Sequence, residues 1–99
     1  MPPRRVYISA GTAVGFLIYK ATPIYPDDAK NARVQGTVVL KAVIGTDGTV
    51  KELTVVSGPH LLQQAALDAV KQWRYRPYLL NGEPVEVGTT INIIFTLGR

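Results

Sequence analysis

The chain contains a single histidine, His60, and nearby Ser57 and Asp68 supply the other two side-chain types of a hydrolytic triad. In such a triad the histidine takes the proton of the serine hydroxyl, and a carboxylate orients the imidazole ring. Asp68 lies eight residues after His60, which is about 12 Å along a helix at 1.5 Å per residue. That separation is too long for a carboxylate to orient the ring, and a serine at a helix start is most often a cap. We therefore expect no nucleophilic catalysis from these residues.

Other catalytic and metal-binding patterns are also missing. Asp27 and Asp28 are adjacent, and adjacent side chains on a helix diverge, so they cannot flank one substrate bond; they suit the positive end of a helix dipole instead. The segment from Gly45 to Gly48 lacks the lysine of a phosphate-binding loop. With no cysteine and one histidine, the chain has no disulfide framework, zinc–thiolate site or thiol nucleophile. We expect no catalytic residue, no metal and no cofactor.

Aromatic and basic residues alternate near Trp73, which is followed by Arg74, Tyr75, Arg76 and Tyr78. This pattern resembles the stacking and cationic contacts that single-stranded nucleic-acid binders use. The alternative is that Trp73 closes the hydrophobic core where a helix meets a strand, and we favour it because no second aromatic cluster continues the platform. The net charge is +4, but most basic residues are spread singly, which is typical of a solvated surface. Nucleic acid is therefore not the expected partner.

The composition allows one ordinary globular domain. The chain has 99 residues, of which 46% are hydrophobic and 18% charged, so disorder and fibrous repeats are disfavoured. Residues 1–21 are interpreted as an N-terminal extension: alternation over 5–10, a turn at Gly11-Thr12 and an apolar stretch over 15–20 predict a β-hairpin. The longest apolar stretch, from Ala13 to Tyr19, is far shorter than the roughly 20 residues that a membrane-spanning helix needs.

The pattern over residues 22–99 predicts the main domain. A short helix starts at Pro26 and stops at Gly36. Strands over 37–44 and 49–57 form a hairpin around an Asp-Gly turn, with a bulge near Lys51. A second helix starts after Ser57 and continues until Pro77, with an apolar stripe facing the sheet. A final strand follows over 89–97. We therefore expect an α+β fold, with two helices packed on one face of an antiparallel β-sheet and the extra N-terminal β-hairpin beside it.

The final strand contains no proline and almost no charge. Its alternation predicts Ile91, Ile93, Phe95 and Leu97 on the inward face. The outward face would carry Thr90, Asn92, Ile94 and Thr96. If this strand lies at a sheet edge, nothing in it discourages pairing with another chain, and it can dock an extended peptide. The alternative is that another part of this chain covers the edge.

A series of motifs from Thr22 to Leu97 resembles the C-terminal domain of TonB-type energy transducers. The match depends on their order and spacing, and the stretch from Trp73 to Pro77 after an alanine-rich helix is the most distinctive. The motifs are Pro23-x-Tyr25-Pro26, Arg33-Val34-Gln35-Gly36-Thr37-Val38, Asp47-Gly48-Thr49-Val50, Ser57-Gly58, Ala65-x-x-x-Ala69-Val70, Trp73-Arg74-Tyr75-x-Pro77 and Gly82-x-Pro84-Val85.

The resemblance implies a periplasmic domain, carried by an inner-membrane anchor and a proline-rich spacer that are absent from these residues. Such domains bind the TonB box of outer-membrane receptors as an added strand, and they transmit energy from the proton gradient through an ExbB–ExbD motor, without a cofactor. The cargoes are iron chelates, vitamins or other nutrients. The implied partner-binding residues are the last strand and the loop before the short helix, namely Thr89, Thr90, Ile91, Asn92, Ile93, Ile94, Phe95, Thr96 and Leu97, with Thr22, Pro23 and Ile24.

Two alternative functions remain open, and so does the oligomeric state. The same module can serve as an interaction domain in another envelope protein, a sensor or a membrane peptidase, without a transport role. A nucleic-acid binder would instead lose affinity steeply with salt. A homodimer paired through the last strand would compete with a partner for one edge.

Family members often carry a glutamine in the loop before the short helix. Thr22-Pro23-Ile24 has none, so receptor choice is expected to differ.

Overall fold

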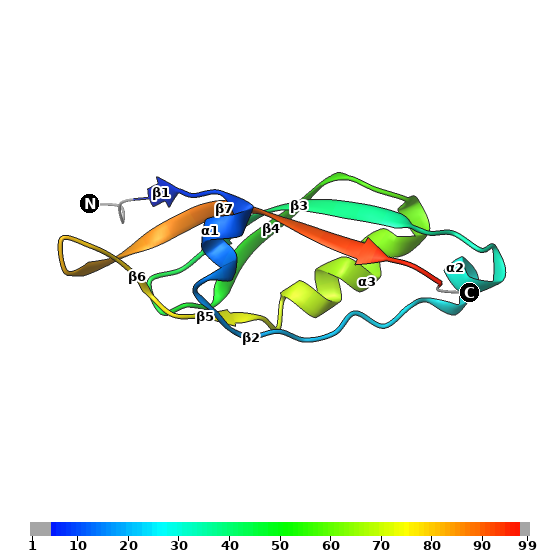
Figure 1. Cartoon of the computed structure of the whole chain (residues 1–99), viewed down its shortest axis with the longest axis horizontal. Helices are drawn as coiled ribbons and strands as arrows, with labels where there is room; N and C mark the ends of the chain where they lie inside the picture. Colours follow the sequence, from blue (N-terminus) through cyan, green and yellow to red (C-terminus); the bar gives the residue numbers. More distant parts are fainter. Residues whose placement is uncertain (1–4, 98–99) are drawn as a thin grey trace.

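The computed structural model describes residues 5–97 and has an elongated shape of 49 × 22 × 18 Å. Within that range it is an α+β fold, as predicted, with three helices and strands that form a central sheet (Figure 1). The elements in chain order are β1 Arg5–Tyr7, α1 Ala10–Val14, β2 Leu17–Tyr19, α2 Asp27–Asn31, β3 Gly36–Ile44, β4 Val50–Ser57, α3 His60–Val70, β5 Arg74–Tyr75, β6 Tyr78–Leu80 and β7 Glu83–Phe95.

The central sheet has the order β1-β7-β3-β4, and β6 pairs with the first residues of β7. β3 is antiparallel to β4 and to β7, and its alternating apolar residues are typical of an antiparallel sheet with one buried face. The predicted inward residues Val38, Leu40, Ala42 and Ile44 are all buried. The β3–β4 register shifts beside Lys51, which confirms the predicted bulge. This sheet gives β7 a fixed partner along one side.

The helix α3 covers the sheet with the predicted apolar stripe. Leu62, Ala66 and Val70 are fully buried, and the small alanine lets the helix approach the strands closely. The helix ends at Val70 rather than continuing to Pro77. Trp73 therefore lies beyond the helix, where it is buried and its Nε1 donates a hydrogen bond to the Ala21 carbonyl at 3.0 Å. The prediction that Trp73 closes the core is confirmed.

The short helix α2 follows Pro26, as predicted, and begins with Asp27 and Asp28 in its first turn. Its end differs from the prediction: Arg33 adopts a positive φ of 57°, so the helical path stops before Gly36. The Tyr25 hydroxyl donates to the Val34 carbonyl after this turn. These contacts hold the loop before α2 against the end of the sheet.

The predicted N-terminal hairpin is wrong. β1 pairs in parallel with β7, and β2 pairs with β5, so the two strands do not pair with each other. Between them the chain forms α1, because the Ser9 hydroxyl caps it by accepting a hydrogen bond from the Thr12 amide at 3.1 Å. Ala13 is buried beneath this helix. Residues 5–19 are therefore built into the sheet and core rather than forming a separate hairpin.

The final strand also has different bounds from those predicted. It begins at Glu83 rather than Thr89 and ends at Phe95 rather than Leu97. The preceding residues, from Tyr78 to Val85, form the hairpin of β6 and β7, with Asn81 and Gly82 at φ 53° and 82°. Two successive residues with positive φ are the signature of a tight hairpin turn. Strand β7 is thus long enough to border several partners in succession.

Candidate functional site

The open side of β7 is the main candidate site. One side of the strand pairs with β3 along residues 87–95. The other side pairs with β1 only over Glu86, Val87 and Gly88. Among the described residues, no strand continues this pairing beyond Gly88. The second half of β7 is therefore a sheet edge.

Alternation along β7 identifies the backbone groups that face this edge. The Ile8 amide donates to the Gly88 carbonyl at 3.0 Å, so Gly88 directs its backbone groups away from β3. In a strand, the N–H and C=O groups of every second residue point to the same side. The backbone groups of Thr90, Asn92 and Ile94 therefore point to the open edge. A single extended peptide can pair with all three residues.

The side chains of β7 alternate as the sequence predicts. Ile91, Ile93 and Phe95 are buried, whereas Thr90, Asn92 and Ile94 are exposed, Ile94 by 70%. These exposed side chains lie on the face of the sheet opposite the helices. They are available to a partner that contacts the edge.

The ends of the predicted 89–97 segment do not belong to the free edge. Thr89 is buried, and its Oγ1 donates to the Ile8 carbonyl at 2.9 Å, so it belongs to the contact with the segment after β1. Thr96 is exposed beyond the strand. Leu97 is half-buried, and its amide donates to Gln35 Oε1 at 2.8 Å. The free edge itself spans Thr90 to Phe95.

A groove of about 300 Å³ lies beside this edge on the helix-bearing side. Its strand wall is formed by Thr90, Ile91 and Asn92, and Trp73 and Tyr75 line its buried part. The Tyr75 hydroxyl in this part of the groove is uncharged at ordinary pH, and burial raises its pKa further, to about 12. The opposite wall comes from α1, β2 and the following residue, namely Ala10, Gly11, Ala13, Val14, Leu17 and Lys20.

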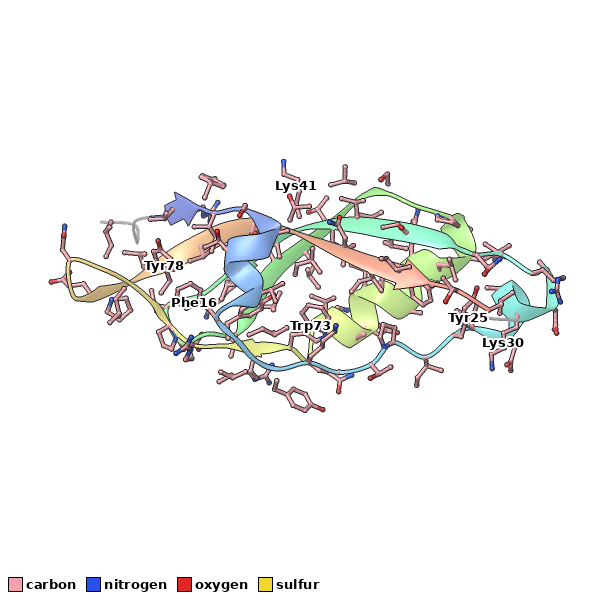
Figure 2. The ribbon with its side chains drawn as sticks, viewed as in Figure 1. Phe16, Tyr25, Lys30, Lys41, Trp73 and Tyr78 are labelled. Atoms are coloured by element: carbon pink, nitrogen blue, oxygen red, sulfur yellow. The ribbon has the colours of Figure 1, made fainter. Side chains whose placement is uncertain are left out.

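Lys20 is the only charged residue among those that line this groove. Its Nζ lies 5.7 Å from the centroid of the Trp73 ring, within range of a cation–π contact. Figure 2 shows Trp73 near the end of α3, beside the chain that follows β2. The groove is thus mostly apolar with one positive group.

The other predicted contact, Thr22-Pro23-Ile24, lies along α3. Thr22 and Ile24 line a separate groove of about 340 Å³ with residues of α3, and Ile24 is 83% exposed. This loop does not line the groove beside β7. The adjacent Tyr25 ring meets Phe95 edge-on, with centroids 5.5 Å apart (Figure 2 labels Tyr25). The two predicted regions are thus connected through this aromatic pair.

Of the residues considered for catalysis, Asp68 has a side-chain partner within its own helix. The Asp68 carboxylate accepts a hydrogen bond from Gln64 Nε2 at 2.8 Å, one turn earlier on α3. His60 begins α3, and Ser57 ends β4. Within residues 5–97, no group of three His, Cys, Asp or Glu residues is placed to hold a metal ion. In the same range, no helix has the length and apolar character to cross a membrane.

The wall formed by α1 was missed by the sequence analysis. Ser9, Gly11 and Thr12 were interpreted as a strand end and a turn, because a helix of five residues is too short to show periodicity. A serine followed three residues later by a threonine was the available signal, since serine is a favoured N-cap. Lys20 carried no signal, because its role depends on where Trp73 lies.

Comparison with known proteins identifies the domain. Residues 21–97 match the family model for the Gram-negative bacterial TonB protein C-terminal region. Curated relatives named Protein TonB include those of Vibrio cholerae (36% identical) and Escherichia coli K12 (30% identical), each over 77 residues and 76% of this chain. The chain spans about a third of the length of these relatives: 32% of the first and 30% of the second.

Solved structures show the same fold. The solution structure of the Pseudomonas aeruginosa TonB C-terminal domain superposes with a TM-score of 0.71 at 21% identity, covering 84% of this chain and 86% of that one. A Vibrio anguillarum TonB2 structure gives 0.63 at 29% identity, covering 85% and 82%. Elements β1, α1 and β2 precede the residues that match the family model. From the family match and the shared fold together, the chain belongs to the TonB C-terminal domain family.

Proposed function

We propose that this domain binds the TonB box of outer-membrane receptors in the periplasm by adding the box as a strand to β7. The observation that carries the proposal is the free edge from Thr90 to Phe95, which has unpaired backbone groups and no charged side chain. The opposite edge of the sheet, β4, contains Lys51, Glu52 and a bulge. Charges and bulges protect an edge from strand addition, so β7 is the better docking edge.

The free edge offers enough backbone pairing to orient a peptide but not to bind it tightly. Thr90, Asn92 and Ile94 provide about six donor and acceptor groups, each worth about 0.5–1.5 kcal/mol net. Association costs at least about 4 kcal/mol in lost freedom of motion. Main-chain pairing alone therefore gives modest affinity with little sequence preference. Side-chain contacts in the neighbouring grooves must provide the rest, and the loop Thr22-Pro23-Ile24 along α3 is the proposed second contact.

The proposed biological role is energy transduction. The domain would be held in the periplasm by an inner-membrane anchor, and force from the proton gradient would reach it through an ExbB–ExbD motor. The domain would pass this force to a receptor that imports iron chelates, vitamins or other nutrients. Membership of the TonB family supports this role. Strand addition also suits it, because several main-chain hydrogen bonds act together when the two strands are pulled along their axes.

The test is an NMR titration with extended peptides from the N-termini of outer-membrane receptors. Saturable shifts are expected at Thr90, Asn92 and Ile94, with smaller ones at Thr22 and Ile24. Ile94→Pro removes one edge donor and should abolish the shifts, whereas Ile94→Ala keeps the donor and should retain most of the affinity.

The same spectra show whether each variant is folded. If a folded Ile94→Pro variant binds like the wild type, the edge of β7 is not the site. If no receptor peptide produces shifts, the domain serves a different partner, as an envelope interaction module would.

A further inference from the structure

We propose that the groove between α1 and β7 selects the partner strand by accepting one of its apolar side chains. This inference rests on the proposed function, because it assumes that a strand adds to β7. The groove wall from Ala10 to Lys20 precedes the residues that match the family model. This wall therefore lies outside the residues that the family model matches.

Strand β1 shows how an added strand sits on this edge. It pairs in parallel with β7, and its side chains alternate. Val6 and the following Ile8 are half-buried, whereas Arg5 and Tyr7 are exposed. Tyr7 lies over Gly88, since a Cβ there would approach the tyrosine ring to 2.5 Å. Every second side chain of a strand on this edge thus turns towards the helix-bearing side.

Helix α1 takes the chain away from the edge where the groove begins. The cap at Ser9 starts the helix directly after Ile8, so β1 cannot extend along Thr90 and the residues after it. A partner strand paired with Thr90 and Asn92 takes the next place on the same edge. Its inward side chain then meets the groove formed by α1, Trp73 and Ile91.

The lining of the groove determines which side chain fits. Small residues such as Gly11 and Ala13 leave the space open, and Val14 and Leu17 make the wall apolar. A cavity of 150 Å³ already holds a benzene ring, so about 300 Å³ accommodates a leucine or an aromatic side chain. Lys20 disfavours a cationic side chain at the same position. The occupant is therefore an extended peptide with an uncharged, apolar residue pointing inward.

The test compares guest residues in one peptide host. Capped heptapeptides of threonine carry a single central leucine, alanine or lysine, and their affinity is measured from the shifts of the Thr90, Asn92 and Ile94 amides. The leucine peptide should bind about tenfold more tightly than the alanine peptide, because it buries a larger apolar side chain. The lysine peptide should bind most weakly.

Three variants localise this preference to the groove. Gly11→Leu adds a bulky apolar side chain to the groove wall, and its Cβ meets no clash because nothing lies within 4 Å of that position. Val14→Ser removes an apolar wall, and Ile18→Ser is its matched control, since both side chains are 64% exposed but Ile18 does not line the groove. The preference for leucine should fall below twofold in Gly11→Leu and Val14→Ser and remain in Ile18→Ser.

The outcomes separate this inference from the proposed function. If binding does not depend on the guest residue yet disappears in Ile94→Pro, the groove proposal is overturned and strand addition stands. If the preference for leucine survives both Gly11→Leu and Val14→Ser, the groove is not its source and the proposal is also overturned. If no threonine peptide shifts the β7 amides while receptor peptides do, a single inward side chain does not select the partner strand, and the groove proposal is overturned. Absence of binding by every peptide overturns both proposals.

Discussion

Replacing Gly48 with alanine is expected to destabilise the domain by about 1.5–3.5 kcal/mol. Gly48 has φ 86°, where a residue with a Cβ costs about 1–2 kcal/mol. A Cβ there would also lie 2.0 Å from the Tyr75 carbonyl oxygen, so the turn and β5 must separate. That movement breaks the hydrogen bond from the Tyr75 amide to the Gly48 carbonyl, at 2.9 Å, which adds about 0.5–1.5 kcal/mol. The site is affected as well, because Tyr75 lines the groove beside β7.

Gly82→Ala is the matched control. Gly82 has a similar φ of 82°, but nothing lies within 4 Å of its Cβ position. This variant should lose only the conformational part, about 1–2 kcal/mol. The difference between the two variants measures the crowding against β5.

The free energy of unfolding is measured by urea denaturation, followed through the fluorescence of the single tryptophan, Trp73. Unchanged m-values would show that both variants unfold from comparable states. At about 4–8 °C per kcal/mol for a domain of this size, thermal unfolding provides a second measurement. Equal destabilisation of Gly48→Ala and Gly82→Ala would refute the contact between the turn and β5.

Three further outcomes are expected. Leu62→Ala should lower the free energy of unfolding in urea by about 2–5 kcal/mol, because Leu62 is fully buried. The control is Leu61→Ala: Leu61 is 39% exposed, so this variant should lose under half as much, and equal losses would contradict this packing. Because the pKa of Tyr75 rises from 10.0 to about 12 on folding, its contribution to stability is complete below pH 10 and is lost as the pH rises towards 12; alkaline unfolding of Tyr75→Phe should lack this loss, and an identical profile would disprove it. Thr89→Val should remove the hydrogen bond to the Ile8 carbonyl and accelerate hydrogen exchange of the Ile8 amide; unaltered exchange would show that this bond does not hold β1.

Local pattern was sufficient to predict the central elements and the family. The alternation from Val38 to Ile44 identifies the buried face of β3, because a strand repeats every two residues. The stripe of Leu62, Ala66 and Val70 does the same for α3, and Ile91 to Phe95 for β7. These patterns record which side of each element contacts the core. The resemblance to the TonB family was available from the sequence for the same reason, since its motifs mark turns and core positions.

Partner choice between strands was decided only by the tertiary structure. The sequence shows that residues 5–7 can be a strand, but their partner is β7, about 80 residues away, and backbone hydrogen bonding carries no sequence code for that choice. The sequence predicted that β1 pairs with the nearer strand, β2. This prediction is wrong because the short helix α1 turns the chain between β1 and β2. The free edge and its groove follow from this arrangement. Their position is set by where β1 stops on β7, and no periodicity within either segment contains that information.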